Sequence, residues 1–180
     1  MTEANVIVNE LQHSADAIDE QAIAAMIDDL RSHDRIFVYA TGRSGLMLKA
    51  FAMRLMQIGL NSFAVGETTT PSVHAGDLLV IASASGETGS VNMMAESALK
   101  QGVDLLVISS NTTSTLAKIQ MPDIVIESAT KFSNSSASVQ PLGSLFEQML
   151  LVLLDSVILK MSQQSADSNQ DMAHRHASLE

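Results

Sequence analysis

The chain has 180 residues, of which 46% are hydrophobic and 17% charged, and its formal net charge at pH 7 is −10. This length and composition suit one globular domain with a hydrophobic core and exclude a disordered chain. Lysine and arginine together number only 10 and there is no cysteine. The lack of cysteine excludes disulfides, thiolate nucleophiles and cysteine metal sites. The few basic residues argue against a nucleic-acid surface but suffice for a small pocket that binds an anionic metabolite.

The N-terminal stretch, residues 1–20, is acidic and lacks the basic and then apolar segments of a signal peptide. The most apolar run, residues 149–159, is interrupted by Asp155 and is much shorter than the ~20 residues that a membrane span requires. We therefore expect a cytoplasmic protein that does not insert into membranes.

Helical and strand patterns alternate along the chain. In chain order we expect a helix at 3–31, a strand at 35–40, a turn at 41–45, a helix at 46–59, a strand at 61–65, a loop at 66–76, a strand at 77–83, a helix at 87–101, a strand at 104–110, a short helix at 114–119, a strand at 123–128, a helix at 142–161 and a polar tail. The strands are continuously apolar, which is typical of a parallel sheet covered on both faces by helices. The prediction is an α/β protein: a three-layer α/β/α sandwich around a five-stranded parallel sheet. We expect residues 1–180 to form one domain, with an N-terminal helix at 3–31, a core at 35–161 and a tail at 162–180.

Two turns rich in hydroxyl groups and glycine follow strands of this sheet, namely TGRSG at 41–45 and SASGET at 83–88. Parallel sheets bind ligands beyond the carboxyl ends of their strands, and helix N-termini attract phosphate. Helix capping by serine and threonine, completed by Glu87, is the alternative for either turn alone. Two such turns at one sheet edge favour a phosphate site. Neither a Walker A sequence nor a G-x-G-x-x-G follows a strand, so nucleotide binding has little support.

Several motifs, at similar spacing from about residue 35 to the C-terminus, resemble the 6-phospho-3-hexuloisomerase family, which is part of the sugar isomerase (SIS) domain proteins. The motifs are GRSG (42–45), AFAMRLMQIG (50–59), GETTTP (66–71), SASGET (83–88), PLGSLFE (141–147) and RHASLE (175–180). SASGET by itself indicates only the wider SIS family, whereas AFAMRLM, GETTTP and RHASLE are more specific. Two family glycines are replaced by Ala40 and Ala84, and residues 129–140 match poorly.

The resemblance implies an isomerase that interconverts D-arabino-hex-3-ulose 6-phosphate and D-fructose 6-phosphate, after formaldehyde has been fixed onto ribulose 5-phosphate. It implies a flavodoxin-like SIS fold, no cofactor and no metal, and a homo-oligomer, with a tetramer favoured. The alternatives are another SIS isomerase, such as one acting on arabinose 5-phosphate, and a noncatalytic sugar-phosphate-binding regulator.

The resemblance also implies which residues bind the sugar phosphate. These are Ser44, Ser83, Ser85 and Thr88, and Arg43 is expected to contact the substrate because it lies beside Ser44.

A shift of a carbonyl from C3 to C2 through a cis-enediol needs a base and a group that carries protons between the two oxygens. Glu147 is the candidate base, because a carboxylate among Phe146, Met149 and Leu150 would be partly removed from water. The alternative is an ordinary first-turn glutamate that faces solvent. The match of LFE to the family favours the catalytic role.

His176 is the candidate proton carrier, since histidine titrates near neutral pH. A mobile terminal histidine is the alternative on position alone, and the match of RHASLE favours function. Because a tail reaches a cleft most easily across a neighbouring subunit, we expect a site shared between subunits. His174 and His176 are only a weak metal signal, and we expect no metal.

Two further residues are weaker candidates: Glu67 for the sugar hydroxyls or the loop, and Arg54 for the phosphate or a carboxylate. The helix at 142–161 is apolar on nearly every side, whereas a surface helix shows a polar face. We therefore expect this helix to be central in the domain and to join a helical bundle between protomers.

Overall fold

The computed structural model describes residues 1–128, 138–163 and 168–178. Most of the segment that matches the family poorly, residues 129–137, lies outside these ranges, as do residues 164–167 and 179–180. The elements in the described ranges are α1 (Glu3–Asp16), α2 (Glu20–Ser32), β1 (Ile36–Tyr39), α3 (Gly42–Gln57), β2 (Ser62–Ala64), β3 (Leu78–Ser83), α4 (Gly89–Lys100), β4 (Asp104–Ser109), α5 (Thr115–Ile119), β5 (Ile124–Val125), α6 (Ser144–Ser162) and α7 (Ser168–His174).

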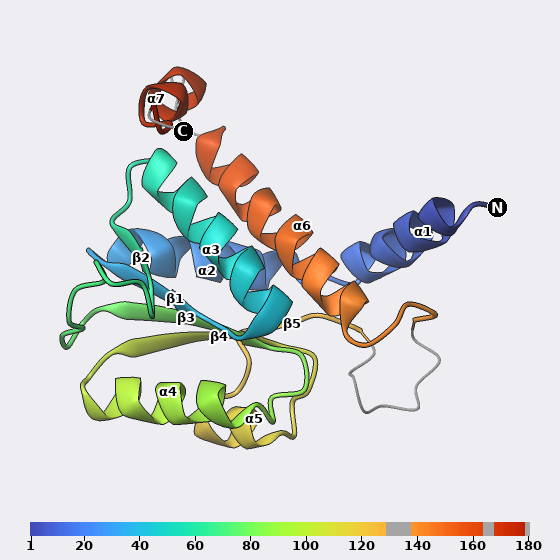
Figure 1. The fold of residues 1–180 in the computed structure, drawn as a ribbon, viewed down its shortest axis with the longest axis horizontal. Helices are drawn as coiled ribbons and strands as arrows, with labels where there is room; N and C mark the ends of the chain where they lie inside the picture. The colour runs from blue at the N-terminus through green and yellow to red at the C-terminus, as the bar shows by residue number, and fades with distance from the viewer. Residues whose placement is uncertain (129–137, 164–167, 179–180) are drawn as a thin grey trace.

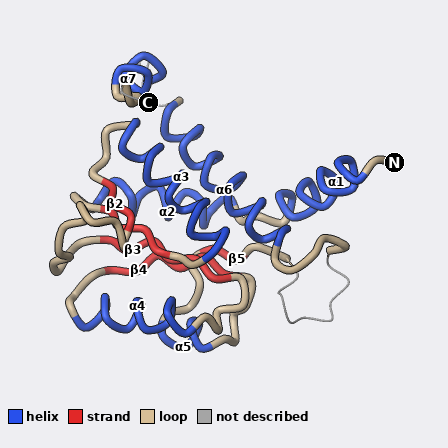
Figure 2. Tube along the Cα trace, viewed as in Figure 1, coloured by secondary structure: helices blue, strands red, loops and turns tan. Residues whose placement is uncertain are grey.

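The five strands form one parallel sheet in the order β2-β1-β3-β4-β5. Helices α2, α3 and α6 cover one face, and α4 and α5 cover the other (Figure 1, Figure 2). Successive residues of β3 serve both layers: Leu78, Val80 and Ala82 pack with α2, α3 and α6, while Leu79 and Ile81 pack with α4. Because both faces of each strand are buried, the strands need an unbroken apolar sequence. The predicted three-layer sandwich with a parallel sheet is therefore confirmed.

The expected single helix at 3–31 is wrong, because the chain breaks at residues 17–19 into α1 and α2. The Asp19 side chain accepts a hydrogen bond from the Gln21 backbone N–H and caps α2. Capping by aspartate offers the backbone an alternative to a continuing helix. As a result α2 packs into the core with α3 and α6, whereas α1 extends outward at one end of the molecule (Figure 1).

The expected turn at 41–45 is also wrong, since α3 begins at Gly42 directly after β1. Gly42 has a φ of +60°, and a Cβ on Gly45 would lie 2.6 Å from the Ala40 carbonyl oxygen. The two glycines thus allow an immediate turn and a close approach of the helix to the strand end. Arg43 and Ser44 consequently lie in the first turn of a helix.

The end of the chain differs in part from the expectation. Strand β5 has two residues where six were expected, and the tail forms the short helix α7. Helix α6 is central, as expected, and packs against α1, α2 and α3, yet Val152 and Leu159 on it are 43% and 57% exposed. Among the described residues, no helix combines the length and apolar character that crossing a membrane would require.

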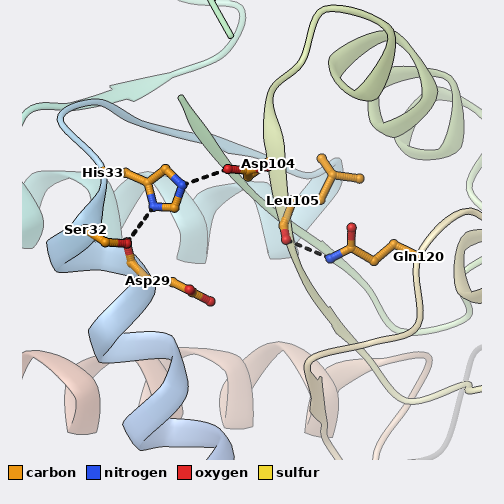
Figure 3. A network of polar contacts seen from close by, with 6 residues as sticks. All are labelled: Asp29, Ser32, His33, Asp104, Leu105 and Gln120. Carbon is orange, nitrogen blue, oxygen red and sulfur yellow. Dashed lines mark hydrogen bonds and ion pairs between the residues drawn. The ribbon is translucent and has the colours of Figure 1, made fainter. Parts of the chain in front are cut away.

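At the N-terminal edge of the sheet, His33 joins α2 to β4 (Figure 3). Its Nδ1 lies 2.7 Å from the Asp29 carbonyl oxygen, and its Nε2 lies 3.1 Å from Asp104 Oδ2. Both partners only accept hydrogen bonds, so both ring nitrogens donate only when the imidazole is protonated. Burial opposes this charge, but the hydrogen bonds to Asp29 and Asp104 outweigh it and raise the pKa of His33 above its ordinary value.

This arrangement predicts a pH-dependent contribution to stability. A group whose pKa is raised on folding stabilises the protein fully below its unfolded pKa, about 6.5 for histidine, and less as pH rises through the folded pKa. We expect the free energy of unfolding to fall between pH 6 and pH 8 by about 0.5 kcal/mol, since the partner carboxylate is largely exposed. Urea unfolding of His33→Gln should lack this decrease, and exposed His13→Gln is the control. An unchanged decrease in His33→Gln would contradict the prediction.

Candidate active site

The candidate site is a cavity of about 290 Å³ at the carboxyl ends of β1 and β3. The chain leaves β1 toward β2 on one side and continues from β3 to β4 on the other, so this edge is the switch point of the sheet, where such folds bind ligands. Three chain segments line the cavity: the start of α3, the end of β3 with the β3–α4 loop that follows it, and the start of α6. The lining residues are Thr41, Ser44, Ala82, Ser83, Ala84, Ser85, Thr88, Gly143, Phe146 and Glu147.

Three helices begin at this cavity, and none has a side-chain cap. Thr41, Thr88 and Gly143 precede α3, α4 and α6, and none of them accepts a side-chain hydrogen bond from its helix. The N-cap residues of α1, α2 and α5, in contrast, do accept such bonds. Uncapped N-termini carry free N–H groups and partial positive charge. The cavity therefore suits an anion, and the capping interpretation of the two turns is wrong for Thr41 and Thr88.

The β3–α4 loop folds around its own hydroxyl groups. Ser83 Oγ accepts the Gly86 N–H at 3.1 Å and lies 3.3 Å from Thr88 Oγ1. Ser85 Oγ accepts the Glu87 N–H at 3.2 Å. Gly86 has a φ of +65°, and a Cβ there would lie 2.0 Å from Ser114 Oγ, so only glycine fits. The loop thereby brings Ser83, Ser85 and Thr88 to one wall of the cavity.

Glu87 does not complete a capping box for α4. Its carboxylate instead accepts hydrogen bonds from the backbone N–H and the hydroxyl of Thr115, the first residue of α5, at 3.0 and 2.6 Å. The side chain therefore joins two loops at the sheet edge, a role that local spacing could not indicate.

Glu147 lies in the first turn of α6 with 7% of its surface exposed. The solvent-facing alternative for this residue is thus wrong. The residue is not a lone carboxylate, however, because Arg43 Nη1 lies 2.9 Å from Glu147 Oε2. The same nitrogen donates to Ser144 Oγ at 3.3 Å. Arg43 is 54% exposed, so it places a positive charge at the edge of the cavity and fixes one oxygen of the carboxylate.

The structure does not bring the weaker candidates into this cavity. Arg54, near the C-terminal end of α3, donates to Gln57 Oε1 at 2.9 Å. Glu67, after β2, pairs with Lys49 Nζ. Neither residue lines the cavity.

His176 lies far from Glu147 of the same chain. It follows α7, which sits beside the C-terminal ends of α3 and α6 (Figure 1), whereas Glu147 is at the start of α6. From Glu147 to Ser162 the helix rises about 22 Å at 1.5 Å per residue. His176 is exposed, and its Nδ1 lies 3.0 Å from the Ala177 carbonyl oxygen.

Five lining residues were not among the predicted site residues, namely Thr41, Ala82, Ala84, Gly143 and Phe146. Gly143 occupies the N-cap position of α6, and Leu142 before it has a φ of +59°, a conformation that is uncommon outside glycine. The Pro-Leu-Gly sequence before an apolar helix was the available signal for this bend. Among the described residues, no cluster of three or more histidine or acidic side chains is arranged to hold a metal ion.

Comparison with known proteins identifies the class. The SIS domain model matches residues 29–154, and the chain belongs to the SIS domain family. A 3-hexulose-6-phosphate isomerase of Bacillus subtilis (strain 168) is 40% identical over 97% of this chain and 95% of its own length. A Mycobacterium gastri protein of the same name is 37% identical over 98% and 89%. A crystal structure from Methanococcus jannaschii, for which 3-hexulose-6-phosphate isomerase function was inferred, has a TM-score of 0.83 and 29% identity, with full coverage of both chains.

Proposed function

We propose that this chain is a 3-hexulose-6-phosphate isomerase, the enzyme also called 6-phospho-3-hexuloisomerase. It interconverts D-arabino-hex-3-ulose 6-phosphate and D-fructose 6-phosphate, the step that follows formaldehyde fixation in the ribulose monophosphate pathway. The observation that carries the proposal is one cavity in which uncapped helix N-termini and hydroxyl groups face the buried carboxylate of Glu147. The relatives named for this activity, which match nearly the whole chain, support the same substrate.

In this proposal the sugar phosphate binds between the start of α3 and the β3–α4 loop. Ser44, Ser83, Ser85 and Thr88 line this part of the cavity. Their hydroxyls donate hydrogen bonds, and the N-termini of α3 and α4 supply partial positive charge. The described residues that line the cavity include no lysine, so in this proposal neutral donors and helix dipoles hold the dianion.

Glu147 then acts as the base. Its carboxylate removes the proton from C2 of the hexulose, and the electron pair of the broken C–H bond forms the C2–C3 double bond of the enediol as O3 gains a proton. Collapse of the enediol returns a proton to C3 and leaves the carbonyl at C2. Arg43 holds Oε2 at 2.9 Å, so we assign proton transfer to Oε1. Removal of the carboxylate from bulk water lowers the cost of reorganisation during this step.

The transfer of a proton from O2 to O3 of the substrate is assigned to His176 of another subunit. Within one chain this histidine is separated from Glu147 by most of the length of α6. Exposed apolar side chains on the neighbouring helices α3 and α6 offer a surface for a second copy: Met53, Met56, Val152 and Leu159 are 40–57% exposed. We propose a homo-oligomer, with a tetramer favoured, in which each site combines two chains.

The experiment that tests this function is a coupled assay of the purified protein. Hexulose 6-phosphate is generated from ribulose 5-phosphate and formaldehyde, and fructose 6-phosphate is detected through a dehydrogenase. We expect enzyme-dependent product at a turnover on the order of 1–10³ s⁻¹. No product from a folded sample would refute the proposal. Turnover of arabinose 5-phosphate alone would then indicate another SIS isomerase, and binding without turnover would indicate a regulator.

A further inference from the structure

The loop that we assign to phosphate binding carries an acidic residue, whose negative charge is unfavourable near an anion. Glu87 lies between Gly86 and Thr88, next to the hydroxyl groups that we assign to the phosphate. A carboxylate directed into the cavity would repel a phosphate. The structure resolves the conflict, because Glu87 does not line the cavity and both of its carboxylate oxygens accept hydrogen bonds from Thr115. The hydrogen bond from the Thr115 hydroxyl, and after it the one from the Thr115 N–H, lower the pKa of Glu87.

The outer side of this loop is attached to the segment between β4 and α5 and to the first turn of α5. The Ser110 N–H donates to the Ala84 carbonyl at 3.2 Å, and the Leu116 N–H donates to the Gly86 carbonyl at 2.9 Å. Asn111 Nδ2 donates to the Ser85 carbonyl at 3.2 Å. With the Glu87 bonds, each residue from 84 to 87 is joined to residues 110–116. The inner side of the loop, in contrast, is the cavity wall.

We infer that Glu87 is a positioning residue for phosphate binding: through Thr115 it holds the β3–α4 loop in the shape that presents Ser83, Ser85 and Thr88 to the ligand. This inference rests on the proposed function and extends it. Glu87 itself does not line the cavity, so it acts on the ligand only through the loop.

The direction in which phosphate affinity changes when Glu87 is replaced distinguishes a positioning role from a purely electrostatic one. Removal of a negative charge near a bound anion tightens binding if charge is the only change. Removal of a positioning residue weakens binding, because the loop hydroxyls lose their arrangement. A phosphate contact stabilises the ground state and the transition state alike, so its loss raises KM and leaves kcat unchanged.

The experiment compares the wild type with Glu87→Ala, Thr115→Val and the double variant. Glu96→Ala, which removes the same charge from an exposed position on α4, is the control. Calorimetry at constant ionic strength gives the Kd of inorganic phosphate, and the coupled assay gives KM and kcat. We expect Glu87→Ala to raise Kd and KM by roughly fivefold to tenfold with kcat within about twofold. Thr115→Val should act in the same direction by a smaller factor, because it removes the hydroxyl bond and leaves the backbone N–H bond. The double variant should equal Glu87→Ala, because Glu87→Ala already removes both hydrogen bonds to Thr115, including the hydroxyl bond that Thr115→Val removes.

Each outcome decides the inference. Unchanged or tighter phosphate binding in Glu87→Ala, additive effects in the double variant, or no phosphate binding by the wild type would overturn it. If Glu87→Ala does not fold, the Kd of phosphate and the KM are compared between the wild type and Thr115→Val, which keeps the side-chain volume. A wild type that binds phosphate but does not turn over hexulose 6-phosphate would refute the proposed reaction, while weaker binding in the variants would still support the positioning role.

Discussion

Replacement of Glu147 by glutamine is expected to reduce kcat by a factor on the order of 10² to 10⁴, the usual contribution of a general base. Glutamine has nearly the same shape as glutamate, so the packing at the start of α6 is retained. It cannot accept the C2 proton, and it leaves Arg43 without the carboxylate that lies 2.9 Å from it. Phosphate binding should change little, because the assigned phosphate contacts come from α3 and the β3–α4 loop.

The matched control is Asp155→Asn, which removes an exposed carboxylate from the same helix. It should retain wild-type kcat and KM. Thermal unfolding of both variants establishes that they are folded, and steady-state kinetics with hexulose 6-phosphate gives the rates. Turnover of Glu147→Gln at the wild-type rate would remove Glu147 from the role of base.

Replacement of His176 by asparagine is expected to lower kcat by about 10²-fold if His176 carries protons between the substrate oxygens. Because the structure places this histidine far from Glu147 of its own chain, the proposal assigns it to the site of another subunit. Arg175 beside it donates to the Gln57 carbonyl at 3.1 Å, which fixes the end of the tail at the C-terminal end of α3. His174→Asn is the control and should leave kcat unchanged.

Mixed oligomers test the shared site directly. Glu147→Gln and His176→Asn subunits, each nearly inactive alone, are unfolded together, refolded and assayed. If each site takes Glu147 from one chain and His176 from its neighbour, half of the pairs are hybrid and half of the sites in each hybrid pair are intact. We therefore expect roughly a quarter of wild-type activity. No recovery, from a sample in which hybrids are demonstrated by mass, would contradict a site shared in this way.

The sequence determined the layers of the fold. Continuous apolar runs such as Leu78–Ser83 fit only strands covered on both faces, and the helices between them complete the parallel arrangement. The errors fall where local signals compete. Asp19 divides the N-terminal helix, and Gly42 and Gly45 start α3 earlier than its apolar pattern does. Such caps and close approaches depend on one or two residues, whereas periodicity is a pattern over many residues and does not reveal the effect of a single one.

The sequence also determined the chemical inventory of the site. The two hydroxyl-rich turns, Ser44, Ser83, Ser85, Thr88 and Glu147 all line one cavity. The periodicity of apolar residues could not predict that these side chains meet, because Glu147 is 103 residues from Ser44 in the chain. The resemblance of the motifs to the family predicted that these residues share one site, and the fold shows how they are arranged in it.

Only the tertiary structure decided how these residues are paired. The strand order β2-β1-β3-β4-β5 places the switch point between the two turns, and strand order is a property of pairing between distant segments. The same reason explains the ion pair of Arg43 with Glu147 and the bonds of Glu87 to Thr115. It also explains the separation of His176 from Glu147 by the length of α6. A sequence specifies which groups are available, but the distance between two side chains is fixed only when the helices that carry them pack.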